Sequence, residues 1–189
     1  MQKILYILFF LYGAVGYSQS NFQLEFDVGY AFQEKLTINN EEIENIGAFG
    51  LRGGFNYLFS FKNKMFIESG VYGKFNRSKR KIQSATITFN DLRLQTPLYV
   101  GYRPLNKFKV GLGASIENNV ELDDIEDRLP YNVRCDILTK VVYEYINNLH
   151  FSLYTHWMVS TALDVYTLSS PKNGVYLGLI YQFGKRNKQ

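Results

Sequence analysis

The sequence predicts an all-β fold, an eight-stranded antiparallel up-and-down transmembrane β-barrel that follows a cleavable signal peptide. Apolar and polar residues alternate with a period of two in about eight segments, as expected of strands with two different faces. No segment after residue 18 reads as a transmembrane helix, and strands cross lipid only as a closed barrel, which satisfies every backbone hydrogen bond. Long and short connections also alternate along the chain, which gives the two rims of a barrel different loops.

The composition suits one strand-rich domain of 189 residues. Aromatic residues make up 16% of the chain, while only 4 residues are proline, so strand formers are abundant and loop formers are scarce. The net charge of +4 is small and its Lys and Arg residues are dispersed, which argues against a nucleic-acid partner. The single cysteine, Cys135, excludes an intramolecular disulfide and a cysteine-built metal site.

Residues 1–18 resemble a secretory signal peptide. Lys3 supplies the positive start, and an apolar stretch follows from Ile4 to Val15. Gly16 and Ser18 are small residues at positions −3 and −1 for cleavage before residue 19. The apolar stretch is shorter than the ~20 residues that a membrane-spanning helix needs. We therefore expect a signal peptide over 1–18 and a barrel domain over 19–189.

The first strand, Phe22–Gln33, shows the alternation most clearly. Its even positions from Phe22 to Phe32 are all apolar, whereas its odd positions are polar or small. Seven more segments repeat this pattern, with Phe, Tyr, Leu or Val on one face and glycine, small or charged residues on the other. These expected strands are Ile46–Ser60, Met65–Asn76, Asp91–Arg103, Phe108–Asn118, Asp136–Ile146, Leu149–Ala162 and Gly174–Phe183.

The fourth strand carries two irregularities. Residues 85–89 alternate in the opposite phase to the residues from Leu92 onward, which predicts a bulge or a break near Asn90. Pro97 lies in the middle of the strand and has no N–H to donate, so we expect a local distortion there.

The connections predict which rim faces which compartment. The first, third, fifth and seventh connections are long: 34–45, 77–83, 119–134 and 164–173. The second, fourth and sixth are short, at 61–64, 104–106 and 147–148. Outer-membrane barrels have long external loops and short periplasmic turns. We therefore expect both termini to lie in the periplasm.

Charge and size indicate that the apolar face points outward. An eight-stranded interior is narrow and is filled by side chains, so the many aromatic residues fit outside it, while glycines and paired charges fit inside. A soluble barrel would have the reverse arrangement, and a sandwich is the other alternative. The expected structural ion pairs of the lumen involve Glu25, Asp27, Arg52, Glu68, Arg93, Glu117, Glu144 and His150.

Two registers can be predicted from the short turns. If Tyr102 pairs with Phe108, then Arg93 faces Glu117 as an ion pair, and Tyr99 covers Gly111. At Asn147-Asn148 a plain two-residue turn would mix the two faces. A three-residue loop or a bulge fits instead and places Glu144 opposite His150.

The chain resembles the small outer-membrane β-barrel family, which includes porin-like and PorT-like proteins and barrels of the OmpA and OmpX type. The resemblance rests on the signal peptide, the eight strands, the strand from Asp91 to Tyr102 and a last strand that ends in Tyr181-Gln182-Phe183. It implies a Gram-negative outer membrane, and recognition of a terminal aromatic residue, Phe183, by the barrel-assembly machinery. It transfers no catalytic residues.

Several residues are candidates for chemistry. His150 and His156 share the inward face but lie roughly 20 Å apart, too far to share a metal. His150-Phe151-Ser152 resembles the His-x-Ser pair of lipid A deacylases, but it falls inward near the periplasmic turn. The acidic segment 121–127 could bind a divalent cation, although it lacks EF-hand spacing. The basic segment 77–81 could contact lipopolysaccharide phosphates, dock on the acidic loop or simply be solvated.

We therefore expect a non-enzymatic integral outer-membrane protein without cofactor or metal, with a structural or surface-interaction role through its external loops. A narrow channel for ions or small solutes is the first alternative, and a lipid-modifying enzyme is the second. Expected partners are outer-membrane lipids, lipopolysaccharide and the barrel-assembly machinery.

Overall fold

The computed structural model describes residues 19–32, 36–38, 41–61, 64–82, 85–120, 133–161 and 173–183. The predicted signal peptide (1–18), the acidic segment 121–127 and the tail after residue 183 lie outside these residues. Within them, no helix is both long and apolar enough to cross a membrane.

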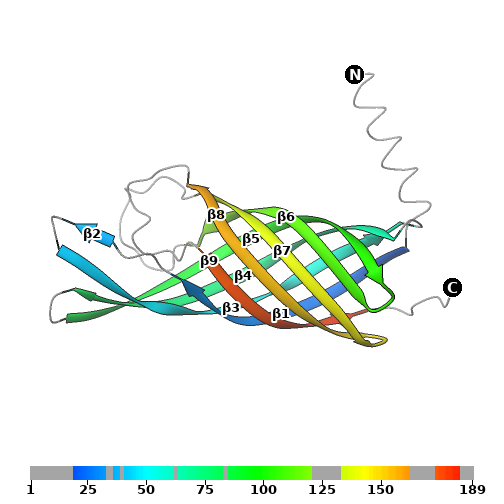
Figure 1. Ribbon diagram of the computed structural model, residues 1–189, viewed down its shortest axis with the longest axis horizontal. Coiled ribbons are helices and arrows are strands. Elements are labelled where there is room, and N and C mark those ends of the chain that lie inside the picture. Colours follow the sequence, from blue (N-terminus) through cyan, green and yellow to red (C-terminus); the bar gives the residue numbers. More distant parts are fainter. Residues whose placement is uncertain are drawn as a thin grey trace, which may run out of the picture.

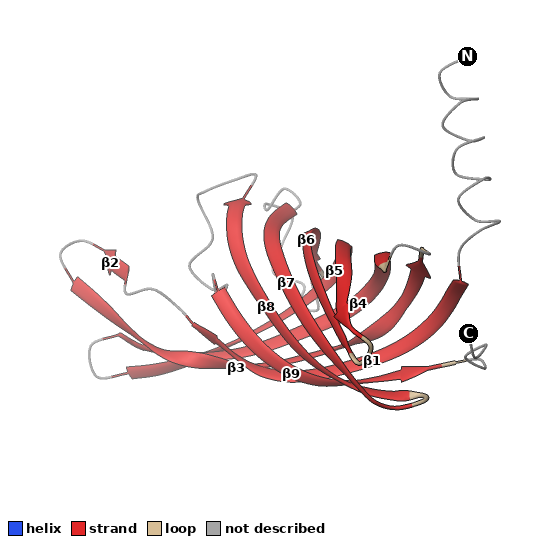
Figure 2. Cartoon of the chain, turned by 45° about the vertical axis from the view of Figure 1, so that its right-hand side comes forward, coloured by secondary structure: helices blue, strands red, loops and turns tan. Residues whose placement is uncertain are grey.

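The described chain forms a closed antiparallel β-barrel (Figures 1 and 2). Its strands are β1 (Gln19–Phe32), β2 (Leu36–Ile38), β3 (Glu41–Ser60), β4 (Met65–Ile82), β5 (Ala85–Leu105), β6 (Phe108–Asn119), β7 (Val133–Ile146), β8 (Leu149–Thr161) and β9 (Asn173–Gln182). Eight of them make up the barrel, in the order β1-β9-β8-β7-β6-β5-β4-β3, and the short β2 pairs only with β3. The predicted eight-stranded fold is confirmed.

β1 closes the barrel by pairing on both sides. Its partners on β9 run from Gln182, opposite Gln23, to Asn173, opposite Phe32. On its other side it pairs with β3, and Ala31 lies opposite Ala48. The predicted closure between the first and last strands is therefore confirmed, and the ring of eight strands has no free edge.

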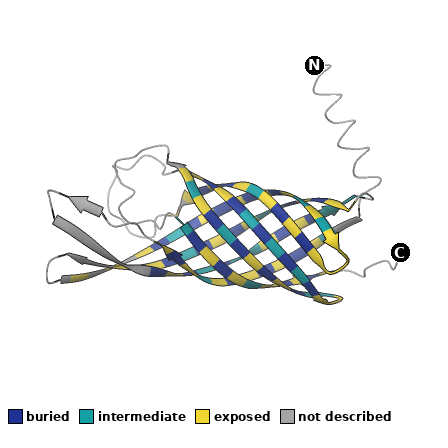
Figure 3. Cartoon of the chain, in the orientation of Figure 1, coloured by how far each residue is buried: buried dark blue, intermediate teal, exposed yellow. Residues whose placement is uncertain are grey.

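Burial alternates along the barrel strands, as the stripes in Figure 3 show. In β1, Phe26 is 54% exposed and points outward, whereas its neighbours Glu25 and Asp27 are completely buried in the lumen. The other even residues from Phe22 to Tyr30 are exposed as well. The apolar face is thus on the outside, the reverse of a soluble barrel.

The β7–β8 turn confirms a predicted register. Ile146 lies opposite Leu149 across Asn147-Asn148, and an irregularity between Glu144 and Ile146 follows. This bulge sends Tyr145 and Ile146 outward together. It lets Glu144 lie opposite His150 on the inward face, as predicted from the need to keep inward residues opposite inward residues.

The β5–β6 register differs from the prediction by two residues. Tyr102 lies opposite Val110 instead of Phe108, and Tyr99 lies opposite Gly113 instead of Gly111. The cause is that β5 continues through Leu105, with an irregularity between Tyr102 and Leu105, before a two-residue turn. The prediction that Arg93 faces Glu117 is therefore wrong.

The strands β3, β4 and β5 continue beyond the rim of the barrel, at the left-hand end of Figure 1. We call their residues 41–47, 77–82 and 85–90 the β3–β5 extension. The predicted long loop at 77–83 is wrong, because β4 runs to Ile82, which lies opposite Ala85. The predicted bulge near Asn90 is also wrong, since β4 and β5 keep one register from Met65 to Ile82. Part of the predicted loop 34–45 likewise forms β2 and the start of β3.

The distortion predicted at Pro97 is present. On the β6 side, Pro97 lies opposite Ser115. On the β4 side, Leu98 pairs with Ser69 and Gln95 pairs with Tyr72, but the two residues between them, Thr96 and Pro97, have no paired partner on β4. The Ser69 hydroxyl donates a hydrogen bond of 2.9 Å to the Pro97 carbonyl, and this side-chain contact bridges the interrupted ladder.

Candidate functional site in the barrel lumen

The lumen gathers the charged side chains of the described barrel. The buried carboxylates number seven: Glu25, Asp27, Glu68, Asp91, Glu117, Asp136 and Glu144. The buried cations number six: Arg52, Lys74, Arg93, Lys109, Arg134 and Lys140. Partly exposed Arg103 contacts Glu144 at 3.0 Å and brings the cations to seven. This balance is physically necessary, because a buried charge without a partner is costly.

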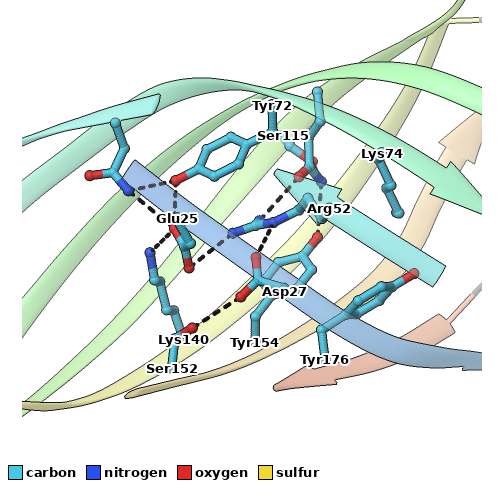
Figure 4. Close-up of polar contacts among 12 residues, drawn as sticks. Glu25, Asp27, Arg52, Tyr72, Lys74, Ser115, Lys140, Ser152, Tyr154 and Tyr176 are labelled. Atoms are coloured by element: carbon cyan, nitrogen blue, oxygen red, sulfur yellow. Dashed lines mark hydrogen bonds and ion pairs between the residues drawn. The ribbon is translucent and has the colours of Figure 1, made fainter. Parts of the chain in front are cut away.

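Arg52 is the centre of this network (Figure 4). Its guanidinium carbon lies 4.0 Å from the ring centroids of both Tyr72 and Tyr154, so the cation is held between two aromatic faces. Its Nε donates to Asp27 at 2.8 Å, and Nη2 lies 3.2 Å from Glu25 Oε1. Arg52 is completely buried, so this stack fills the middle of the lumen.

Lys140 reaches Glu25 from the opposite side of the barrel. Its Nζ lies 2.7 Å from Glu25 Oε2 and also forms an ion pair with Glu68. Tyr72 donates its hydroxyl to the same Glu25 oxygen at 2.6 Å, and Asn56 donates to it at 3.1 Å. We refer to Glu25, Asp27, Arg52, Tyr72, Tyr154 and Lys140 together as the central cluster.

A second group, the extension-side cluster, lies nearer the β3–β5 extension and consists of Lys74, Glu117, Arg134, Asp136 and His156. Lys74 forms a 2.8 Å ion pair with Glu117, and Arg134 pairs with Asp136. His156 Nδ1 lies 3.2 Å from Asp136 and 3.0 Å from Arg134 Nη2.

Gln95 joins this group to the central cluster. Its Oε1 accepts a hydrogen bond from Arg52 Nη1 at 3.2 Å, and its Nε2 donates to Glu117 at 2.7 Å. The same Nε2 lies 2.9 Å from the Tyr154 hydroxyl. The two clusters are therefore one continuous network.

Glycines make room for the inward aromatic rings. Tyr72 lies opposite Gly54, Tyr99 opposite Gly113, Tyr176 opposite Gly29 and Phe66 opposite Gly101. A Cβ at Gly113 would lie 2.9 Å from the Tyr99 ring, and one at Gly29 would lie 2.5 Å from the Tyr176 ring. Both distances are shorter than a carbon–carbon contact allows. The absence of a side chain at these positions lets the rings fill a narrow interior.

The turn-side end of the lumen is more apolar. Four buried apolar side chains, Leu58, Phe66, Val142 and Ile180, come from four different strands. Beside them, Lys109 lies 3.0 Å from Glu144, which also contacts Arg103. Apolar inward residues of this kind were missed by the sequence argument, which treated the inward face as polar throughout.

All eight residues expected in the lumen are buried, with at most 5% exposure. Glu25, Asp27, Arg52 and Glu68 form the contacts described above. The expected Arg93–Glu117 pair is replaced by two others, because the two-residue shift places Asn119 opposite Arg93 and Gln95 opposite Glu117. Arg93 Nε contacts Asp91 at 2.7 Å, and Glu117 contacts Lys74.

Of the candidate residues for chemistry, the two histidines and Ser152 lie among the described residues, whereas the acidic segment 121–127 lies outside them. His150 and Ser152 are both buried in the lumen, and the Ser152 hydroxyl donates to Asp27 at 3.0 Å. His156 contacts Arg134 and Asp136, far along β8 from His150. The described residues contain no group of three or more His, Cys, Asp or Glu side chains arranged to hold a metal ion.

Sequence reasoning missed the partners that meet across the lumen. Arg134 and Tyr176 were not expected to face inward, and the link between Lys140 and Glu25 joins strands that are not neighbours. Strand alternation gives the face of each residue, but only the closed geometry gives contacts across it. Alternation along β9 places every second residue from Gly174 to Gln182 on the inward face, and this pattern could have identified Tyr176 as an inward residue.

The fold and the lumen together define a small eight-stranded β-barrel with an apolar exterior and a packed, charge-balanced interior. Outer membrane protein OprG of Pseudomonas aeruginosa has a similar structure: it is 12% identical, the match covers 88% of this chain and 97% of OprG, and the TM-score is 0.51. Neisserial surface protein A is 15% identical, with 87% of this chain and 99% of that chain covered and a TM-score of 0.50. At these identities the likeness establishes the fold, that of small outer-membrane β-barrels.

No family model matches the sequence, and no curated protein matches it.

Proposed function

We propose that this chain is a non-enzymatic integral outer-membrane β-barrel with a sealed lumen, which acts through the end that carries the β3–β5 extension. The observation that carries the proposal is the position of Arg52, completely buried between Tyr72 and Tyr154. A conducting path would expose the side chains around it to water. With its interior closed, the barrel offers partners its external end and its lipid-facing wall.

The outer surface supports a membrane location. Large apolar side chains are exposed on every barrel strand, among them Phe26, Phe55, Leu98, Leu112 and Leu177, each at least 53% exposed. Soluble monomers rarely expose apolar patches larger than a few hundred Å². Aromatic side chains near both ends of the strands, such as Tyr30 and Tyr181, are also exposed and suit the headgroup boundary.

The proposed orientation places the extension outside the cell and the short turns in the periplasm. The turns at Asn106-Lys107 and Asn147-Asn148 lie at the same end as the start of β1 and the end of β9 (Figure 1). Short turns and both termini face the periplasm in barrels of this kind. Protease added to intact cells should therefore cleave only at the opposite end.

Planar-bilayer recordings test the sealed lumen. We expect the wild-type protein to give no steady conductance, and the charge-neutral double variant Arg52→Ser with Asp27→Ser to conduct, because it empties the centre of the lumen. Leu98→Ala, which changes only the outer wall, is the matched control and should stay silent. Steady conductance of the wild type would overturn the proposal in favour of a narrow channel.

Membrane fractionation with heat-modifiable gel mobility tests the location. We expect the protein in the outer-membrane fraction, with a mobility that shifts on boiling. A water-soluble protein that shows no shift would contradict the proposal.

The lipid-modifying alternative is addressed by mass spectrometry of lipid A. His150 and Ser152 lie inside the barrel, away from lipid, so we expect the same lipid A in a deletion strain and in its parent. A change in acylation that the Ser152→Ala variant fails to restore would support the enzyme.

Phe183 is the proposed signal for the barrel-assembly machinery. It follows β9 directly, is exposed, and packs against Tyr181 and Phe22 at centroid distances of 5.0 and 5.6 Å. We expect Phe183→Ala to slow the appearance of heat-modifiable protein in cells. Equal rates for the variant and the wild type would contradict this role.

A further inference from the structure

Among the side chains that the structure describes, the lumen holds charges of both signs, whereas the exposed charges are of one sign. The seven carboxylates whose side chains the structure describes are all buried in the lumen; the side chains of Glu41, Glu42 and Glu44 at the start of β3 are outside that set. The exposed charged side chains are all cations, namely Lys64, Arg77, Lys79 and Lys107. Lys64 and Lys107 lie next to the turns, whereas Arg77 and Lys79 lie at the end with the extension. These four exposed cations attract anions at the two ends of the barrel.

Arg77 and Lys79 lie where the outward face of β4 changes from apolar to basic. Outward positions on β4 run through Val71, Gly73 and Phe75 before they reach Arg77, so the change takes place within roughly 7 Å along the strand. On β3, the residue opposite Arg77 is Phe49, which is 51% exposed. Exposed aromatic rings of this kind favour the boundary between acyl chains and headgroups.

The residues beside these two cations on β5 are polar and uncharged. Asn90 lies opposite Arg77, Thr88 lies opposite Lys79, and both side chains are exposed. Amide and hydroxyl groups can donate hydrogen bonds to an anion, and they carry no negative charge that would neutralise the cations. Lys81, in contrast, lies opposite Glu44 on β3 and is not part of the site.

We propose that Arg77 and Lys79, with Asn90 and Thr88, form a docking surface for the phosphate headgroup of an anionic lipid in the outer leaflet. The forked Arg guanidinium binds a phosphate through two parallel hydrogen bonds, and the Lys ammonium adds a point charge. The acyl chains of the same lipid lie against the apolar face of β4 below. The inference rests on the proposed membrane location and orientation.

The test measures binding of lipid to the purified, folded full chain by native mass spectrometry. The probes are bisphosphorylated lipid A and the same lipid after removal of both phosphates. We expect the double variant Arg77→Glu with Lys79→Glu to bind bisphosphorylated lipid A at least about tenfold more weakly than the wild type. The wild type and the variant should bind the dephosphorylated lipid equally.

The matched control is Lys64→Glu with Lys107→Glu, which makes the same change in net charge at the turn-side end. It should bind bisphosphorylated lipid A as the wild type does. Equal binding by the Arg77/Lys79 variant and the wild type would overturn the proposal. An equal loss in both double variants would also overturn it, because the effect would then be one of net charge. Displacement of the lipid by millimolar inorganic phosphate would show a site for free phosphate instead.

Heat-modifiable mobility separates this proposal from the proposed function. A variant that inserts and shifts on boiling, yet binds lipid A normally, contradicts only the docking surface. A wild-type protein that does not insert contradicts the membrane location itself. If the charge reversal prevents folding, Arg77→Gln with Lys79→Gln removes both charges without adding negative ones, and it should still weaken binding severalfold.

Discussion

The β3–β5 extension continues three of the eight strands of the barrel wall, yet its residues follow different rules. In the wall, one side of each strand faces an apolar exterior and the other a crowded lumen, so burial alternates along the strands (Figure 3). On β3, for example, Asn56 and Leu58 are buried, whereas Phe55 and Tyr57 are exposed. In the extension, the sheet leaves the closed ring (Figure 1), and β5 has no described partner on its outer edge before Leu92. Beyond the closed ring there is no lumen, so the rule of an apolar outer face and a polar inner face does not hold there, and residues 85–89 alternate in the opposite phase to the wall.

This contrast means that the same type of substitution should have large effects in the wall and small effects in the extension. Removal of a lumen charge should cost most, because its partners stay buried. The introduction of a charge on the outer wall should cause the second-largest loss of stability, and the addition of a side chain at a crowded glycine the third-largest. Shortening of the extension should have the smallest effect on stability.

Arg52→Ala should destabilise the folded barrel most, by about 3–5 kcal/mol. The substitution removes the cation that pairs with Glu25 and Asp27, while both carboxylates stay buried. The measurement is urea unfolding of the protein in lipid vesicles, followed by heat-modifiable mobility. Arg77→Ala at the base of the extension is the control and should stay within about 0.5 kcal/mol of the wild type. Similar losses for the two variants would remove the distinction between wall and extension.

Leu98→Arg should cost about 2–4 kcal/mol in vesicles, the range for a cation on the lipid face near the bilayer midplane. Leu98 is 54% exposed on the outward face of β5. Thr88→Arg, on the same outward face but in the extension, should have almost no effect on the same unfolding curve. If Leu98→Arg proves equally harmless in vesicles, the outer wall does not face lipid.

Gly54→Ala should cost about 1–3 kcal/mol, the usual range for overpacking. A Cβ at Gly54 would overlap the Val71 carbonyl oxygen and would lie 2.6 Å from Tyr72 Cα, and these backbone atoms cannot rotate away. Gly73→Ala is the matched control, because its nearest neighbour, the Gly53 carbonyl oxygen, would lie 3.9 Å away. We expect Gly73→Ala to be neutral or slightly stabilising. Equal losses at both positions would mean that the overlap with the backbone at Gly54 is not the cause.

The same contrast explains which features of the fold could be predicted from the sequence. In the wall, alternation identified the eight strands and the inward position of Glu25, Asp27 and Arg52. The need to keep inward residues opposite inward residues across the Asn147-Asn148 turn predicted the bulge between Glu144 and Ile146. In the extension, the polar run from Arg77 to Gln83 was read as a loop, because this run has no alternating apolar residues to mark it as a strand.

The contacts between side chains inside the lumen were harder to predict than the side of the strand on which each residue lies. The Arg93–Glu117 pair failed because β5 runs on to Leu105, and an irregularity of this kind moves every later pair along the ladder. The link between Lys140 and Glu25 spans the lumen between β7 and β1, and no ladder register describes it. A sequence argument can therefore supply the members of the network, while their pairing depends on the closed geometry.

The extension itself should be nearly dispensable for folding. Replacement of residues 79–88 by Asn-Gly would join β4 to β5 at the positions of Ser78 and Phe89, which already lie opposite each other, and Asn-Gly favours a tight hairpin turn. The loss in unfolding free energy should stay below about 1 kcal/mol, because no lumen charge is removed and one loop is shortened. The shortened protein should still show heat-modifiable mobility. If it fails to fold, the extension helps to nucleate the β4–β5 hairpin, and the division between wall and extension holds only for the finished structure.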